Sequence, residues 1–303
     1  DAQESRGLGD VYKRQVFTSS GGNFPAVVKA ILLDPEARSQ SEALSLASSG
    51  KPREPILRAT AFLRAFGAKS QLPLSDLTAY GFPSTELAKF PVGTTRPRLN
   101  NSTSALGQSP LAAPTVFNWF LPDYSPAGLL AANGLNSPEL QLANENTVIL
   151  STNFLYNSTI ASTPSVSSLI DQNLPPYNYG TSAHNVLIDV APLNALYMAV
   201  VDVNGDGLFT NLDIGAFNNP TKIAEACTAV VDRIDLLLCA GGLNARYGNT
   251  PGKPRKLILD AVASISASSN SSNSSSNQAN YMRDRIRTAL WLVMSSPECV
   301  IQK

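Results

Sequence analysis

The stretch PTKIAEACTAVVDRIDLLLC, residues 220–239, decides the fold class, because its apolar residues recur at the spacing of an amphipathic helix. A proline stands at its start, and Gly241 and Gly242 follow its end. Proline at the first helical position and glycine just past the last one are common at helix termini. The stretch therefore predicts a long helix with one apolar face.

The same spacing recurs on both sides of this helix. Residues 23–38 (NFPAVVKAILLDPEAR) and 54–68 (EPILRATAFLRAFGA) show it toward the amino terminus, with Gly67 in the place of a C-terminal cap. The other predicted helices cover residues 138–157, 192–201, 254–266 and 281–303. Alternation typical of strands is scarce and is best seen in HNVLIDVAP, residues 184–192. The sequence predicts a mainly α, irregular multi-helix domain with long loops rich in Pro, Asn and Ser.

Composition restricts the class of protein. The chain has 303 residues, of which 43% are hydrophobic and 15% charged, so it can bury a proper core. Lys and Arg number 23 against 23 for Asp and Glu, which argues against the basic surface that nucleic-acid binding requires. No apolar run approaches the roughly 20 residues that span a bilayer. Low charge with abundant Ser, Asn, Thr and Pro is more usual in exported bacterial proteins.

The clearest chemical motif is DVNGDGLFTNLD, residues 202–213, between two predicted helices. A twelve-residue calcium loop of the EF-hand type takes oxygen ligands from positions 1, 3, 5, 7, 9 and 12 and has glycine at position 6. Here Gly207 falls at position 6. The predicted metal ligands are Asp202, Asn204, Asp206, Leu208 through its carbonyl, Thr210 directly or through a water, and Asp213. We expect a structural Ca²⁺ site with an EF-hand-like loop.

The same residues are also compatible with two alternatives to a calcium site. An Asp/Asn/Gly-rich turn can also be held by its side chains bonding their own backbone. Magnesium prefers fewer protein ligands and retained waters. Asp213 stands where calcium loops usually have a bidentate Glu, so its shorter side chain demands a tighter loop or binds less well. The loop resembles that of dockerin modules, which carry two copies, whereas this sequence contains one, so docking to a cohesin is not supported.

Four segments are expected along the chain. Residues 1–15, DAQESRGLGDVYKRQ, resemble a translated sequencing adapter of the kind found at the ends of metagenomic gene models, or else form a disordered polar arm. Residues 16–200 form a helical domain, residues 201–221 an inserted calcium loop with its exit helix, and residues 222–303 the closing helices. Within the last segment, residues 264–280 are too poor in apolar groups to pack and predict a disordered linker.

Cysteine and histidine suggest little chemistry. Cys227, Cys239 and Cys299 form an odd set without CxxC spacing, which makes a zinc site improbable. Cys227 and Cys239 fall on one predicted helix about 18 Å apart and cannot bond to each other. Either of them could meet Cys299, or all three could be buried thiols. His184 is the only histidine, and no GxSxG elbow accompanies it, so a surface or core role is favoured over a Ser-His-Asp triad.

Two carboxylates are candidates for acid–base chemistry. Asp123 lies in NWFLPDYSP beside the aromatic residues Trp119, Phe120 and Tyr124, and this segment is either a ligand platform or, more commonly, a packed loop. Glu145 lies in a polar run with Gln141, Asn144 and Asn146. That run could line a cleft, but a hydrogen-bonded network that holds the neighbouring loop is the favoured interpretation.

Several stretches together resemble a bacterial family, the domain of unknown function 1800. They are NFPAVVKAILLDPEAR, KPREPILRATAFLRAFGA, GQSPLAAPTVFNWFLPDYSP with PELQLANENTV, and VDRIDLLLC followed by RIRTALWLVMSSPECVIQK. The resemblance covers nearly everything after Gln15 and implies the C-terminal portion of a longer, periplasmic or extracellular protein. Members look exported and often accompany a second exported family, the domain of unknown function 1501, which resembles sulfatases. The resemblance supplies no activity and no catalytic residues.

The sequence thus predicts an exported, calcium-stabilised helical scaffold or interaction module that acts with a secreted partner. The alternative is an extracytoplasmic hydrolase of a polymer, with Asp123 or Glu145 in a site shared with a missing amino-terminal half. A further alternative is calcium-dependent adhesion to a surface polysaccharide.

Overall fold

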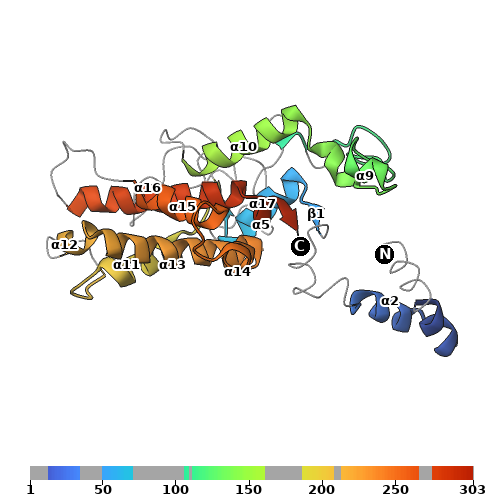
Figure 1. Cartoon of the computed structure of the whole chain (residues 1–303), viewed down its shortest axis with the longest axis horizontal. Helices are drawn as coiled ribbons and strands as arrows, with labels where there is room; N and C mark the ends of the chain where they lie inside the picture. The colour runs from blue at the N-terminus through green and yellow to red at the C-terminus, as the bar shows by residue number, and fades with distance from the viewer. Residues whose placement is uncertain are drawn as a thin grey trace, which may run out of the picture. The chain divides into compact units, whose positions relative to one another are not determined.

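The fold is that of a computed structural model, which describes residues 13–34, 50–70, 106–108, 111–160, 186–207, 213–265 and 275–302 (Figure 1). It is mainly α-helical, with only two-residue strands in the described ranges, as the sequence predicts. None of the helices that it describes combines the length and the apolar character needed to cross a membrane.

Within the described ranges, sixteen helices and strands have defined bounds. In chain order they are α2 (Phe24–Leu32), β1 (Lys51–Pro52), α5 (Pro55–Ala65), β2 (Lys69–Ser70), α9 (Leu129–Ala132), the 3-10 helix η1 (Pro138–Leu142), α10 (Glu145–Thr159), β3 (Val186–Leu187), α11 (Ala191–Val201), α12 (Ile214–Phe217), α13 (Pro220–Cys239), α14 (Gly242–Tyr247), α15 (Pro254–Ala263), α16 (Ser275–Ser295), α17 (Pro297–Val300) and β4 (Ile301–Gln302).

The chain divides into two compact units at residue 50. In the first, α2 is capped by Asn23, whose side chain accepts a hydrogen bond from Ala26 N, and proline follows the cap. Its apolar side chains, including Phe24, Val28 and Leu32, are exposed. The second unit runs from Lys51 to Gln302. The domain boundaries at residues 15, 200 and 221 stay predictions.

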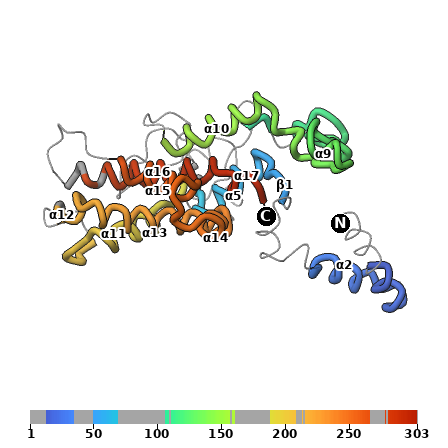
Figure 2. The backbone as a smooth tube through the Cα atoms, in the orientation of Figure 1, coloured from blue at the N-terminus to red at the C-terminus, as the bar shows by residue number. Residues whose placement is uncertain are grey.

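Helix α13 is the centre of the second unit. It packs against α11, α14, α15 and α16, and in Figures 1 and 2 these helices run side by side. Its buried residues recur in adjacent pairs four apart, the period of one helical face. They are Ala226, Cys227, Val230, Val231, Ile234, Asp235, Leu238 and Cys239. The predicted helix over residues 220–239 is confirmed at both ends.

The end of α13 shows why a glycine stands at position 241. Ala240 and Gly241 both take positive φ, 53° and 78°, so the chain reverses in the left-handed region. The amide of Gly241 donates to the carbonyl of Asp235 at 3.1 Å and closes the last turn. Glycine adopts this backbone without the steric strain that a side chain brings. The turn brings α14 back against α13.

Helix α16 supplies the opposite wall of the core. Met282, Ile286, Leu290 and Val293 are all buried and face α13 and its neighbours. Helix α10 packs on the other side of α16, where Tyr156 meets Trp291 edge to face with ring centroids 5.4 Å apart. Most of the buried apolar side chains in the described part of the chain therefore belong to one cluster.

Two short antiparallel pairs join distant parts of the chain. Lys51 pairs with Gln302 and Pro52 with Ile301, while β2 pairs with β3 through Lys69 and Leu187. The pairing of Val186–Leu187 agrees with the strand pattern expected in HNVLIDVAP. Gly67, with φ of 55°, ends α5 as expected for a C-terminal cap.

The closing helix differs from the prediction in two ways. Helix α16 begins at Ser275, inside the predicted linker 264–280, and the polar side chain of Gln278 is buried there. Residues 266–274 lie outside the described residues. The predicted helix 281–303 also stops early: α16 ends at Ser295 and Pro297 begins α17. Proline cannot donate the hydrogen bond that would continue the helix.

Candidate calcium loop

The predicted calcium loop connects α11 to α12 and α13. Asp202 is the C-cap of α11, and its amide donates to Met198 O at 2.8 Å. The structure describes residues 202–207 and Asp213, which are the first half of the loop and its final carboxylate. Leu208 and Thr210, the predicted ligands at positions 7 and 9, lie outside the described residues.

The carboxylate of Asp202 organises the first half of the loop. Its Oδ1 accepts from Gly205 N at 2.7 Å, and its Oδ2 accepts from Gly207 N at 2.8 Å. Both glycines take φ of 73°, and an added Cβ at either would meet no atom within 4 Å. The glycines are therefore required by backbone conformation rather than by space. The turn wraps around the Asp202 side chain.

Asp213 holds the other end of the loop. It is fully buried, and its Oδ1 accepts from Val203 N at 2.9 Å, so the last predicted ligand reaches back to the start. Its carbonyl accepts from Phe217 N at 2.9 Å in the first turn after the loop. One residue thus connects the exit of α11 to α12.

The middle ligands do not form a cage in this conformation. Asn204 Nδ2 donates to Asp206 Oδ2 at 2.8 Å, and both residues are exposed. Among the described residues, no three acidic, histidine or cysteine side chains lie close enough together to hold a metal ion. Calcium binding would require Asp202, Asp206 and Asp213 to draw together and the Asn204 amide to turn its oxygen inward.

A packed aromatic pair lies beneath the loop. The rings of Tyr197 and Phe217 stack at 6.1 Å between centroids and 25° between planes, and both side chains are buried. The Tyr197 hydroxyl accepts a hydrogen bond from the Arg285 guanidinium, which also donates to Ile265 O at 2.7 Å. Burial raises the pKa of Tyr197 to about 12, although the nearby Arg285 charge opposes that shift.

The raised pKa of Tyr197 predicts a loss of stability in alkali. A tyrosine with a pKa of 10.0 unfolded and about 12 folded binds more protons in the native state over this interval. Its contribution to the free energy of unfolding is complete below pH 10 and is lost as the pH rises through about 12. We expect wild type to lose about 2–3 kcal/mol more than Tyr197→Phe over this range. Urea unfolding at several pH values measures the difference, and parallel curves for the two proteins would refute it.

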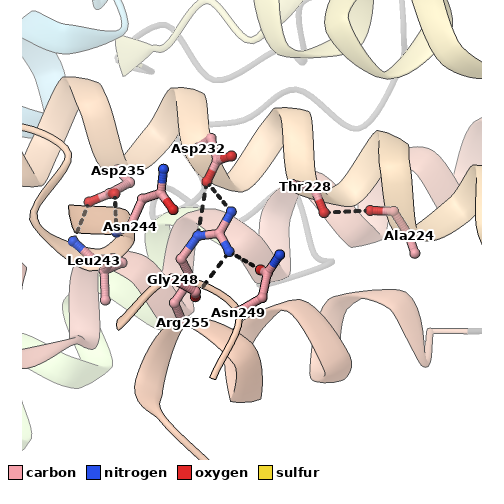
Figure 3. Close-up of polar contacts among 9 residues, drawn as sticks. All are labelled: Ala224, Thr228, Asp232, Asp235, Leu243, Asn244, Gly248, Asn249 and Arg255. Carbon is pink, nitrogen blue, oxygen red and sulfur yellow. Dashed lines mark hydrogen bonds and ion pairs between the residues drawn. The ribbon is translucent and has the colours of Figure 1, made fainter. Parts of the chain in front are cut away.

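Helix α13 carries two carboxylates that fix its neighbours (Figure 3). Asp232 Oδ1 accepts from Arg255 Nη2 at 2.6 Å and from Nε at 3.0 Å, and Arg255 is buried. The same guanidinium donates to Gly248 O at 3.1 Å and to the Asn249 side chain. It therefore connects α13 to α15 and to the turn between α14 and α15.

Asp235 caps the next helix from the same face of α13. Its two carboxylate oxygens accept from Leu243 N at 3.0 Å and from Asn244 N at 2.9 Å, as Figure 3 shows. These amides lack partners within α14 because they lie in its first turn. Burial raises the pKa of Asp235, against the lowering effect of the two amides. We did not predict this pair from the sequence, where both aspartates lie within an amphipathic repeat.

A family model described as "Protein of unknown function (DUF1800)" matches residues 12–301, nearly the whole of the sequence. The chain belongs to this family. No curated protein and no solved structure matches it significantly. The match confirms the family resemblance carried by the helical motifs. It begins within the segment 1–15, of which Lys13, Arg14 and Gln15 are helical in the structure.

In this DUF1800 chain the two candidate acids are at the solvent. Asp123 is exposed in the loop before α9, and Glu145 is exposed in the first turn of α10. Over the described residues no hydrogen bond or ion pair joins them. Paired acid–base catalysis requires the two groups to converge at a reacting atom. His184 lies outside the described residues.

The polar run before α10 holds the aromatic loop. Gln141 Oε1 accepts from Leu121 N at 2.7 Å, which ties the run to NWFLPDYSP. Asn144 is the N-cap of α10 and accepts from Thr147 N at 2.9 Å. Trp119 is half-buried, whereas Val116 is 95% and Phe117 57% exposed. The segment is thus anchored by hydrogen bonds but presents apolar side chains to the solvent.

Proposed function

We propose that this DUF1800 protein is a helical scaffold or interaction module that works in the periplasm or outside the cell with an exported partner, stabilised by Ca²⁺ in residues 202–213. The observation that carries the proposal is the arrangement of the two terminal carboxylates. Asp202 already gathers the amides of Gly205 and Gly207, and Asp213 already reaches back to Val203. Positions 1 and 12 of a calcium loop are the two that close it.

The loop's place in the fold gives calcium a structural task. Asp213 directly precedes α12, and its carbonyl accepts from the amide of Phe217 at the end of that helix. Phe217 in turn stacks on Tyr197 of α11. An ion held by Asp202, Asn204, Asp206 and Asp213 would join the end of α11 to the start of α13. Two of the three carboxylates stand on the entering and leaving sides of the loop, so their charge would be neutralised by the ion.

An exported setting favours such a site. Calcium loops outside the cytoplasm function with dissociation constants near 10⁻⁴–10⁻³ M, so a loop with Asp in place of the bidentate Glu would still be occupied there. The balanced charge and the polar composition of the chain agree with that setting. As partner we propose an exported protein of the domain of unknown function 1501 family, which the resemblance implies.

The segment 111–121 is the surface that we assign to this partner. Leu111, Val116 and Phe117 are largely exposed, and Leu121 is 42% exposed. Gln141 holds the segment in place at Leu121. An anchored loop with exposed apolar side chains is typical of a protein–protein contact. No observation favours the alternative of a hydrolase with Asp123 or Glu145 in its site.

Calcium is expected to raise the melting temperature of this protein. At 100 times its dissociation constant, an ion that binds only the folded state adds about 2.7 kcal/mol to the free energy of unfolding. Asp202→Ala/Asp206→Ala should abolish the rise. The measurement is differential scanning calorimetry with calcium, with magnesium and with a chelator.

A matched control removes two carboxylates elsewhere. The side chains of Asp260 and Asp284 are 60% and 46% exposed and are not ligands of the loop, so Asp260→Ala/Asp284→Ala should keep the full calcium response. A melt that calcium leaves unchanged, or a response that the loop variant retains, would overturn the metal site. Sedimentation of the protein mixed with the exported partner tests the proposed interaction between them. Two separate boundaries, unchanged from those of the single proteins, would contradict that interaction.

A further inference from the structure

We propose that Cys239 and Cys299 are the two halves of a disulfide that forms when the protein folds in an oxidising compartment. Cys239 is the last residue of α13, and Cys299 lies in α17, which packs against α13. Both thiols are buried in the same core cluster, and Arg53 joins their neighbours, since its amide donates to Val300 O at 2.8 Å and its Nη1 donates to Leu238 O at 2.7 Å. Two cysteines whose neighbours along the chain are held together in this way need little backbone movement to bond.

Two arginines prepare this pair for oxidation. Arg53 Nη1 donates to Leu238 O at 2.7 Å, and Arg58 Nη2 donates to Met294 O at 2.7 Å. The first bond places Arg53 beside the end of α13 that carries Cys239, and the second holds Arg58 to the end of α16, just before α17. Arg53, Arg58 and Cys299 also line one small cavity, with room for about one water. Arg58 Nε is buried without a hydrogen-bond partner.

The charges give the two sulfurs different roles. The hydrogen bond from Cys239 lowers the pKa of Cys299, as do Arg58 and Arg53, although burial works in the other direction. The same hydrogen bond, together with burial, raises the pKa of Cys239. Cys299, which lines the cavity together with both guanidinium groups, is therefore the sulfur that ionises and attacks first, since the thiolate is the nucleophile. Cys239 is the resolving thiol.

The oxidant is a second disulfide, RSSR, of a small molecule or of an oxidoreductase. The Cys299 thiolate attacks one of its sulfurs, the RS–SR bond breaks, and RS⁻ leaves with one electron pair. Cys239 then gives up its proton to the solvent, attacks the Cys299 sulfur and releases the second RS⁻. The two thiols are oxidised by two electrons, and the oxidant is reduced to two thiols.

Cys227 is excluded from this pairing and provides an internal control. It lies twelve residues before Cys239 on α13, about 18 Å away along the helix. Burial raises the pKa of Cys227 to about 11, so it stays a thiol at neutral pH. One bond and one free thiol account for all three cysteines.

The bond would connect α13 to the segment that ends in β4. Residues 239 and 299 are 60 positions apart (299 − 239), so the cross-link closes a long loop in the unfolded chain. Cross-links of long loops restrict the unfolded state and raise stability. We expect the oxidised protein to melt on the order of 10 °C above the reduced one.

The experiment refolds the protein in oxidised or in reduced glutathione, both with chelator, so that calcium has no part in the result. Denatured samples are alkylated, digested without reduction and analysed by mass spectrometry. The expected product is a peptide pair joined through Cys239 and Cys299, with Cys227 alkylated. Alkylation of all three cysteines after oxidation, or a cross-link through Cys227, would overturn the proposal.

Conservative variants keep the test independent of folding defects. Cys227→Ser should retain the rise in melting temperature on oxidation, whereas Cys239→Ser and Cys299→Ser should each abolish it while folding like reduced wild type. A cross-linked wild type that melts with the reduced protein would refute the stabilising role. Because no calcium is present, failure of this proposal leaves the proposed calcium site unaffected, and the reverse also holds.

Discussion

Replacing Ile234 by alanine is expected to lower the free energy of unfolding by about 3–4 kcal/mol. Ile234 is completely buried at the middle of the inner face of α13, where α11, α15 and α16 all pack. Removing most of an isoleucine side chain loses its transfer free energy and leaves a cavity that the surrounding helices fill only in part. Urea unfolding followed by circular dichroism measures the change at constant m-value.

Leu236, two residues further along the same helix, provides the matched control. Its side chain is 57% exposed, so Leu236→Ala should change the free energy of unfolding by no more than about 0.5 kcal/mol. Helix propensity scarcely differs between the two variants, since both introduce alanine into α13. Equal losses for the two would mean that α13 does not bury the face described above.

Asp232→Ala is expected to cost about 2–3 kcal/mol. The substitution removes the carboxylate from a guanidinium whose side chain is only 3% exposed, and a buried charge without its partner is strongly destabilising. The expected loss is below the range for fully buried pairs, because Asp232 itself is 37% exposed and Arg255 retains Gly248 O and the Asn249 side chain. Thermal and urea unfolding both report it.

Two further variants separate charge from packing at this site. Asp232→Ala/Arg255→Met removes both charges and should recover much of the loss, as apolar replacements of buried ion pairs often do. Asp260→Ala breaks the exposed pair with Lys256 on α15 and should cost less than about 0.5 kcal/mol. If Asp232→Ala were as mild as Asp260→Ala, Arg255 would not depend on its carboxylate.

The helices could be predicted from the sequence wherever a local signal marks both face and ends. Residues 220–239 begin at a proline and end before a glycine in the left-handed region, and the structure places α13 there. The start of α16 could not be predicted, because residues 275–280 are Ser, Asn, Gln and Ala without a helical apolar stripe. Its helical state depends on tertiary packing, such as the burial of Gln278, which a local pattern does not contain.

The candidate loop could be predicted as a motif, since its oxygen ligands and its glycine occur at fixed positions in the sequence. The proposed pairing of Cys239 with Cys299 could be stated only as one possibility, because it depends on how α17 packs on α13. The contacts of Asp232 with Arg255 and of Asp235 with α14 could not be predicted from the sequence either. An aspartate within an amphipathic helix is usually a solvent-exposed residue, and its sequence position does not show a buried partner.

The pairing of β1 with β4 brings the two ends of the second unit together. Lys51 and Gln302 are direct partners in an antiparallel ladder, so their Cα atoms are about 5 Å apart. A fold whose two ends adjoin can be rewired: a short linker can join Gln302 to Lys51, and new ends can be opened at a surface loop. Because its two ends lie close together, the whole unit can also be inserted into a surface loop of a host protein.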